Sequence, residues 1–151
     1  MGIRLSEKEF QKLISKNSKD QQNVKKNKYK NKKITFNGIT YDSKNEMLRH
    51  LDLLQQEKLK IISSLSYHNK SNEIILLQDP LIKYIPDFCY FEGEYFVIED
   101  FKGFQTKEFK LKKKLLISLL RKSTINTKFR LVKNKNNHFT IFEEYIFITN
   151  E

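Results

Sequence analysis

The stretch Tyr84–Gly103, YIPDFCYFEGEYFVIEDFKG, decides the fold of this chain. It reads as two strands rich in aromatic and β-branched residues, joined by a tight turn around Gly93. Side chains alternate between the two faces of a strand, so Asp100 and Lys102 share a face. In an antiparallel hairpin that turns near Gly93, Asp87 returns roughly opposite Glu99 to Asp100. The sequence therefore predicts two acids and a lysine together at the end of a small sheet.

An acidic pair of this kind predicts a bound cation. Two carboxylates about 4 Å apart repel by roughly 4 kcal/mol at an effective dielectric of about 20. Oxygen-only ligation suits Mg²⁺ or Mn²⁺, and a lysine beside the ion can hold or deprotonate an attacking water. The alternative interpretation of each residue is a solvated charge on the exposed face of a hairpin.

The hairpin and two neighbouring segments resemble a known family. Pro86-Asp87 followed by Asp100-Phe101-Lys102 is similar to the PD-(D/E)XK nuclease pattern, with Asp in the (D/E) place. Three strings, FNGITYDSKNE (36–46), IKYIPDF (82–88) and IEDFKG (98–103), resemble a phage-borne, Holliday junction resolvase-like branch of that superfamily. The resemblance extends over most of the chain, from about residue 29 to residue 120.

This resemblance implies a metal-dependent endonuclease that hydrolyses DNA. In the implied mechanism, Asp87 and Asp100 hold one or two Mg²⁺ (or Mn²⁺) with help from the carbonyl of Phe101. Lys102 then orients or activates the water. The implied substrate is branched or junction DNA in phage recombination or replication, while cleavage of DNA ends or flaps stays open. Enzymes of this type are typically dimers, so a homodimer is expected.

Three further residues near these strings need an interpretation. Glu46 stands three residues after Ser43, which is the spacing of a capping box; the resemblance instead implies a catalytic acid that joins the metal site, and both roles can hold. Glu99 points to the strand face opposite Asp100, so we interpret it as a residue that either supports the site from behind or is purely structural. His68 stands where the related branch tends to have glutamine, and we assign it no role.

Length and composition limit the alternatives. At 151 residues the chain predicts one globular domain, without an apolar run long enough for a transmembrane helix or for a signal peptide. The single cysteine, Cys89, cannot form an internal disulfide and lies among strand aromatics, so we expect it to be buried. A lone cysteine fits a reducing cytoplasm, which is that of a bacterial host if the protein is phage-borne. The three histidines lack zinc-site spacing.

The charge predicts a polyanionic partner, namely DNA. The net charge is +11, and residues 1–33 alone hold eleven Lys/Arg against three Asp/Glu. Residues 15–33 contain little to bury and predict a basic arm on phosphates, with contacts from Lys25, Lys26, Lys28 and Lys30. The alternative is solvated disorder, because abundant Lys, Asn and Ile also resemble an AT-rich coding bias. We therefore divide the chain into 1–33, a short helix at 5–10 plus the arm, and 34–151, the nuclease-like domain.

The remaining pattern predicts an α/β fold, a mixed four- to five-stranded sheet flanked by helices in a restriction-endonuclease-like core. We expect a hairpin at 33–42, helices at 44–60 and 107–122, and strands at 61–67, 73–77, 128–132 and 139–148. Thr106 should cap the second helix. We expect Leu59 on the buried stripe of the first helix and Leu111 and Leu119 on that of the second, where Lys112 flanks the core and could bind a phosphate.

Two other functions compete with the enzyme. The chain could be a basic DNA-binding or partner-binding module on a nuclease fold that no longer cuts. It could also be an RNA- or ribosome-associated basic protein. The intact set Asp87, Asp100 and Lys102 argues against both, because a protein without catalysis has no reason to keep a costly acid cluster.

Overall fold

The structure of the protein is a computed structural model that describes residues 32–149. Contacts divide the chain into two units, Met1–Lys44 and Asn45–Glu151, and each is described by itself. The helix predicted at residues 5–10 and the arm lysines Lys25, Lys26, Lys28 and Lys30 lie outside the described residues. No helix in the described part of the chain is long and apolar enough to cross a membrane.

The described part of the first unit contains a β-hairpin. Strands β1 (Ile34–Phe36) and β2 (Ile39–Tyr41) pair antiparallel. Asn37 and Gly38 form the turn with φ of 48° and 78°, the left-handed conformation that a two-residue turn of this type requires. The Asn-Gly signal therefore predicted this hairpin correctly.

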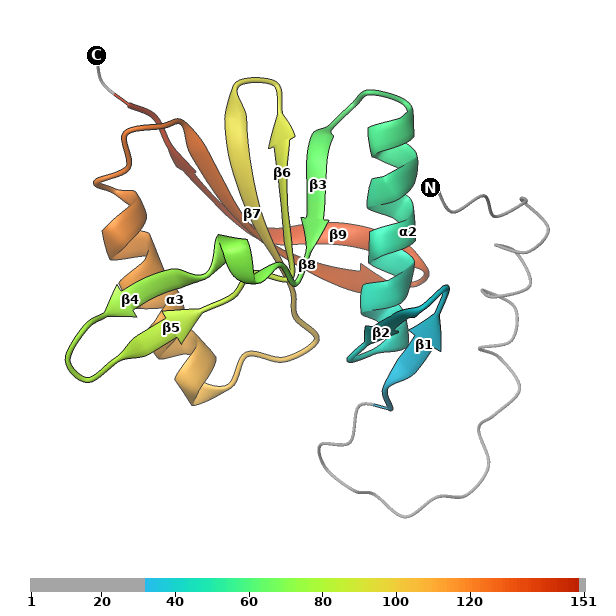
Figure 1. The fold of residues 1–151 in the computed structure, drawn as a ribbon, viewed down its shortest axis with the longest axis horizontal. Helices are drawn as coiled ribbons and strands as arrows, with labels where there is room; N and C mark the ends of the chain where they lie inside the picture. Colours follow the sequence, from blue (N-terminus) through green and yellow to red (C-terminus); the bar gives the residue numbers. More distant parts are fainter. Residues whose placement is uncertain (1–31, 150–151) are drawn as a thin grey trace. The chain divides into compact units, whose positions relative to one another are not determined.

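A five-stranded mixed sheet forms the centre of the second unit, with the strand order β3-β6-β7-β8-β9 (Figure 1). Its strands are β3 (Ser63–Tyr67), β6 (Phe88–Glu92), β7 (Tyr95–Phe101), β8 (Thr127–Lys135) and β9 (His138–Phe147). β7 and β8 run parallel, and the other neighbouring strands run antiparallel. The predicted α/β class with a mixed sheet of four to five strands is confirmed.

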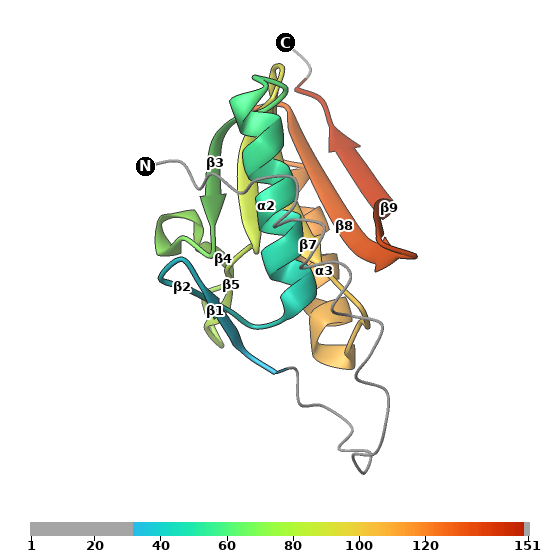
Figure 2. The ribbon, with the colours of Figure 1, turned by 90° about the vertical axis from the view of Figure 1, so that its right-hand side faces the viewer.

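The two faces of this sheet are covered by different helices (Figures 1 and 2). The helices are α2 (Lys44–Lys58) and α3 (Lys107–Leu120). Phe109 of α3 packs in one core cluster with Cys89, whereas Leu53 of α2 packs in another with Phe88. Phe88 and Cys89 are consecutive along β6, so their side chains point to opposite faces. α3 connects β7 to β8, which is the crossover that a parallel strand pair needs.

A second small hairpin lies on the α3 side of the sheet. It consists of β4 (Ile74–Leu77) and β5 (Ile82–Tyr84), and the 3₁₀ turn η2 (Lys70–Asn72) precedes it. Leu76 and Tyr84 pack into the cluster under α3. Tyr84 was predicted to lie in the same strand as Cys89, which was wrong. Pro86 interrupts that strand, because its nitrogen cannot donate to a strand ladder.

Three leucines predicted to be buried are exposed. Leu59 is 64% exposed because it lies beyond the end of α2. Leu111 is 53% and Leu119 is 41% exposed, since α3 faces the sheet with Phe109 and Leu116 instead. At about 100° per residue, Leu111 lies roughly 200° around the helix from Phe109.

Candidate active site

The two acids of the central hairpin meet at the end of the sheet. Phe88 of β6 pairs with Glu99 of β7, so Asp87, one residue earlier, lies opposite Asp100, within the predicted range of Glu99 to Asp100. The Asp87 amide donates to Asp100 Oδ1 over 3.1 Å, and the Phe101 amide donates to Asp87 Oδ2 over 2.8 Å. The Asp87 and Asp100 residues are only 6% and 1% exposed. Backbone hydrogen bonds therefore hold two buried carboxylates side by side.

Lys102 is the cation that the two acids share. Its Nζ lies 3.0 Å from Asp100 Oδ2 and 3.9 Å from Asp87 Oδ2, and 4.7 Å from the centre of the Phe109 ring. Burial by itself would lower the pKa of Lys102, but the charges of Asp100 and Asp87 outweigh burial, so the pKa is raised. Lys102 is therefore a charged donor directed at the acids.

This single lysine does not neutralise the pair. Burial, and after it the charge of Asp87, raises the pKa of Asp100 to about 6, because both favour the neutral carboxyl group. One pKa unit corresponds to about 1.4 kcal/mol between the two protonation states. The cluster is short of positive charge, and shifts of this kind are frequent at functional sites.

Glu46 lies in the same region, on α2. It is buried, with 8% exposure, and accepts a hydrogen bond from the Tyr67 hydroxyl over 3.3 Å. Its charge is also among those that raise the pKa of Lys102, so Glu46 lies within electrostatic reach of the acid cluster. Its roles as a metal ligand and as a helix cap both stay predictions.

His68, to which the sequence analysis gave no role, contacts the acid pair. Its Nε2 lies 2.9 Å from Asp87 Oδ1, and its amide donates to the Asp87 carbonyl over 2.9 Å. The pairing of Tyr67 in β3 with Phe88 in β6 brings the next residue, His68, beside Asp87. That pairing joins strands that are distant in sequence, so no local pattern reveals it.

Tyr84 is a second side chain that sequence reasoning missed. Burial raises the pKa of Tyr84 well above its usual value, and the charges of Asp100 and Asp87 add to this effect, so the hydroxyl lies near the pair. Within residues 32–149, it is the one buried side-chain polar atom without a hydrogen-bond partner in bonding geometry. A donor beside the acids is therefore left for a ligand or a water.

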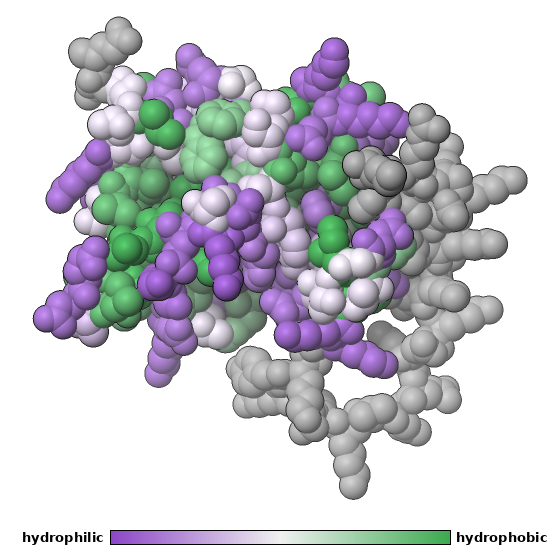
Figure 3. Space-filling view, in the orientation of Figure 1, coloured by the Kyte–Doolittle hydropathy of each residue, from purple (hydrophilic) through white to green (hydrophobic). Residues whose placement is uncertain are grey.

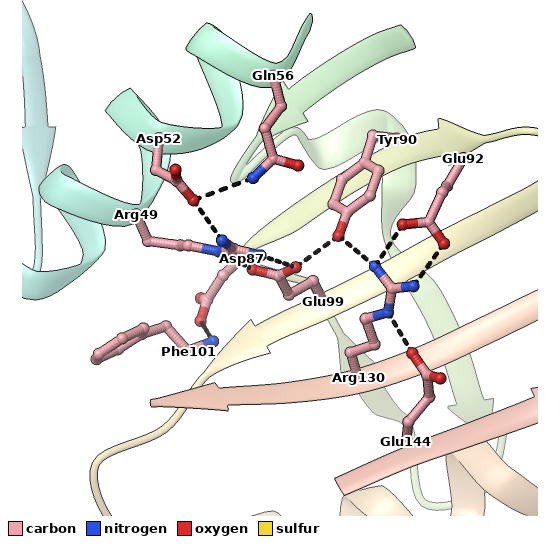
Figure 4. Close-up of polar contacts among 10 residues, drawn as sticks. All are labelled: Arg49, Asp52, Gln56, Asp87, Tyr90, Glu92, Glu99, Phe101, Arg130 and Glu144. Carbon is pink, nitrogen blue, oxygen red and sulfur yellow. Dashed lines mark hydrogen bonds and ion pairs between the residues drawn. The ribbon is translucent and has the colours of Figure 1, made fainter. Parts of the chain in front are cut away.

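The opposite face of β7 carries an acid that is fully paired (Figure 4). Glu99 is 0% exposed and accepts hydrogen bonds from Arg49 Nε at 2.7 Å, Arg49 Nη2 at 2.9 Å and the Tyr90 hydroxyl at 2.6 Å. The network extends through the Tyr90 hydroxyl to Arg130, Glu92 and Glu144. Because Arg49 belongs to α2, the pair fastens this helix to the sheet, in agreement with the structural role expected for Glu99.

The donor set of the acid pair fits a hard divalent cation. Mg²⁺ is usually bound through one or two carboxylates, with water and substrate phosphates as its other ligands. Asp87 and Asp100 supply two such carboxylates, and the partnerless hydroxyl of Tyr84 lies near them. In the part of the chain that the structure describes, no group of three or more His, Cys, Asp and Glu side chains is arranged as a metal site.

Lys112, the helix residue predicted to bind a phosphate, has a protein partner. Its Nζ lies 3.1 Å from Glu108 Oε1, one turn earlier on α3. Glu108 is largely exposed, with a side-chain exposure of 77%, so this pair contributes little to stability. The phosphate-binding role of Lys112 stays a prediction.

A comparison with protein families finds a match over most of the chain. The family is described as a protein of unknown function (DUF1064), and it matches residues 26–136. That segment contains Glu46, Asp87, Asp100 and Lys102. No curated protein and no solved structure matches the chain.

Proposed function

This chain belongs to the DUF1064 family, and we propose that it is a metal-dependent endonuclease that hydrolyses phosphodiester bonds in DNA. The observation that carries the proposal is the pair of buried carboxylates, Asp87 and Asp100, with one lysine between them. An acid pair that one lysine compensates only in part is costly to bury. Binding of a cation and a phosphate at this site would explain why the chain keeps two buried acids despite that cost.

Each side chain of the cluster has a distinct task in this reaction. Asp87 and Asp100 hold Mg²⁺ or Mn²⁺, together with the Phe101 carbonyl, and Glu46 holds the metal or its water. When bound, the ion polarises the scissile phosphate and stabilises the leaving oxygen. Lys102 donates hydrogen bonds that orient the attacking water.

The substrate we propose is branched DNA, in the bacterial host cytoplasm if the protein is phage-borne. The net charge of +11 supports a nucleic-acid partner, and the strings that resemble junction-resolving nucleases support the branched form. A homodimer would present two such sites to the two related strands of a junction.

The experiment that tests the proposal is incubation with Mg²⁺ and a panel of linear, flap and four-way DNA. We expect cleavage that depends on the metal, disappears with EDTA and is strongest on branched substrates. The Asp87→Ala protein, purified in the same way, controls for contaminating nuclease. Equal cutting by this variant would overturn the assignment.

A second function, a basic DNA-binding module without catalysis, is favoured by one observation. The Lys102 ammonium lies 3.0 Å from Asp100 Oδ2 and therefore already supplies a cation to the acids. Soaking crystals in Mn²⁺ separates the two functions. An anomalous peak between Asp87 and Asp100 supports the enzyme, whereas no peak at millimolar Mn²⁺ supports the binding module.

A further inference from the structure

The helix that follows the candidate site presents a row of cations to solvent. We call this set the α3 row; its members are Lys107, Lys110, Lys114 and Arg121. Their spacings of three, four and seven residues place them within about 60° of one another around the helix. All four are exposed, and among residues 32–149 none of these side chains has an ion pair or a hydrogen bond.

The other charges of α3 lie outside this row and are paired. Lys112 pairs with Glu108, the one acid of the helix, and Lys113 pairs with Glu143 at 2.7 Å. Glu108 lies about 100° around the helix from Lys107. The row is therefore a one-sign surface, and it differs from the mixed charges expected of a face that only needs solvation.

The row begins close to the acid cluster. α3 starts five residues after Lys102, and the ring of Phe109 in its first turn lies 4.7 Å from Lys102 Nζ. Figure 3 shows hydrophilic side chains projecting from the side of the molecule where α3, β4 and β5 lie. The row therefore begins at the end of α3 that lies beside the acid cluster, on a helix face about 100° to 160° around from Phe109.

We propose that the α3 row binds the phosphate backbone of duplex DNA on its way to the acid cluster. The proposal rests on the proposed function for the position of the scissile phosphate. The row is about 21 Å long at 1.5 Å per residue, and each strand of B-DNA carries a phosphate every 3.4 Å or so along the axis. The row therefore extends over the rise of about six base pairs, which is long enough for its four cations to contact separate phosphates. Contacts of this kind position a duplex without reading its sequence.

The test measures affinity of the full chain for a fluorescent DNA duplex over a range of salt, in EDTA so that nothing is cut. The row variant carries Lys107→Gln, Lys110→Gln and Lys114→Gln. The matched control carries Lys58→Gln, Lys70→Gln and Lys135→Gln, three exposed lysines elsewhere in the second unit. Both variants lose the same net charge, so only the position of the charge differs.

We expect the row variant to lower the slope of log affinity against log salt by about 2.7, at about 0.9 per lost phosphate contact. The control should lower it by less than one contact. Equal slopes in the two variants, or no change from wild type, would overturn the proposal, because the lysines would then act only through net charge.

A cleavage assay at low salt with Mg²⁺ separates this proposal from the proposed function. If the row variant binds with a reduced slope while wild type cuts no DNA, the α3 row is a DNA surface and the nuclease assignment fails. If wild type cuts and the slopes are equal, the nuclease assignment stands and the row fails. A reduced slope with cutting retained at low salt supports both.

Discussion

Two consecutive acids of β7, Glu99 and Asp100, are buried on opposite faces of the sheet and have opposite surroundings. The Glu99 carboxylate receives three hydrogen bonds, two of them from the Arg49 guanidinium and one from Tyr90. The Asp100 carboxylate lies against a second acid, Asp87, and both share Lys102. Accordingly the pKa of Asp100 is raised to about 6, by burial first and then by the charge of Asp87.

This difference separates a structural acid from a candidate functional one. A buried charge is tolerated when its partners are complete, and Glu99 meets that condition. Asp100 does not, so its face of the strand has a deficit of positive charge that a divalent cation would remove. The proposed site is therefore recognised by missing charge compensation more than by the presence of acids.

The largest effect should come from removing Asp87 or Asp100, the two acids whose charges are only partly compensated. Asp87→Ala or Asp100→Ala should lower Mg²⁺-dependent cleavage at least a thousandfold, since loss of metal coordination removes about 4 kcal/mol or more of transition-state stabilisation. DNA binding should persist or strengthen slightly, because a negative charge near phosphate is lost. Rates come from gel assays and affinities from fluorescence anisotropy. Glu94→Gln, at an exposed acid in the turn between β6 and β7, is the control that keeps cutting; turnover by either alanine variant would end the assignment.

The next largest effect concerns stability, on the face of β7 where Glu99 is paired with Arg49. Arg49→Met leaves Glu99 buried without its cation, and breaking a buried pair in this way costs about 3–5 kcal/mol. The double variant Arg49→Met, Glu99→Met removes both charges and should regain most of this stability, because an apolar replacement of a buried pair is often neutral. Urea unfolding measures all three proteins. If the single variant lost less than about 1 kcal/mol of unfolding free energy, the Arg49–Glu99 pair would not be what holds α2 on the sheet.

A pH series tests the charge deficit at Asp100. Its folded pKa of about 6 exceeds the ordinary value of 3.8, so the folded state binds more protons between these values. This contribution to stability is complete below about pH 4 and is lost as the pH rises through 6, up to about 3 kcal/mol. Asp100→Asn lacks the titration, so without metal it should be increasingly more stable than wild type from pH 4 to pH 7. Melting temperatures across that range give the difference, and a constant difference would refute the deficit.

Local signals account for the parts of this structure that the sequence predicted. Asn37-Gly38 specifies a two-residue turn, and the Thr106 hydroxyl accepts from the Phe109 amide at the start of α3. The turn at Gly93 sets the register that brings Asp87 opposite Asp100. Each feature depends on residues close together in the chain, so periodicity and turn chemistry were sufficient to predict it.

The partners of the acids were missed because they come from distant segments. His68 reaches Asp87 through the pairing of β3 with β6, and Arg49 reaches Glu99 across 50 residues. Leu111 was misplaced for a related reason, since its helix has more apolar positions than its buried face can accommodate. A single sequence does not state which strands pair or which helix face is covered.

The smallest expected effect comes from removing one tyrosine hydroxyl on each face of the sheet. Tyr90→Phe removes a hydroxyl that donates to Glu99 and accepts from Arg130, so it should destabilise the protein by about 1–3 kcal/mol. Tyr84→Phe removes a buried hydroxyl that lies near Asp100 but has no hydrogen-bond partner in bonding geometry among residues 32–149. It should be neutral or stabilise by less than about 1 kcal/mol, because no hydrogen bond is lost and a polar group leaves the interior.

Urea unfolding in EDTA and Mn²⁺ calorimetry complete this comparison. If the Tyr84 hydroxyl serves the bound site, Tyr84→Phe should weaken Mn²⁺ binding although it leaves stability intact, and Tyr90→Phe should do the reverse. Equal destabilisation by both variants would show that Tyr84 already has a structural hydrogen bond. The two faces of β7 would then be alike in how they satisfy their polar groups, and the charge deficit at Asp100 would be the only difference between them.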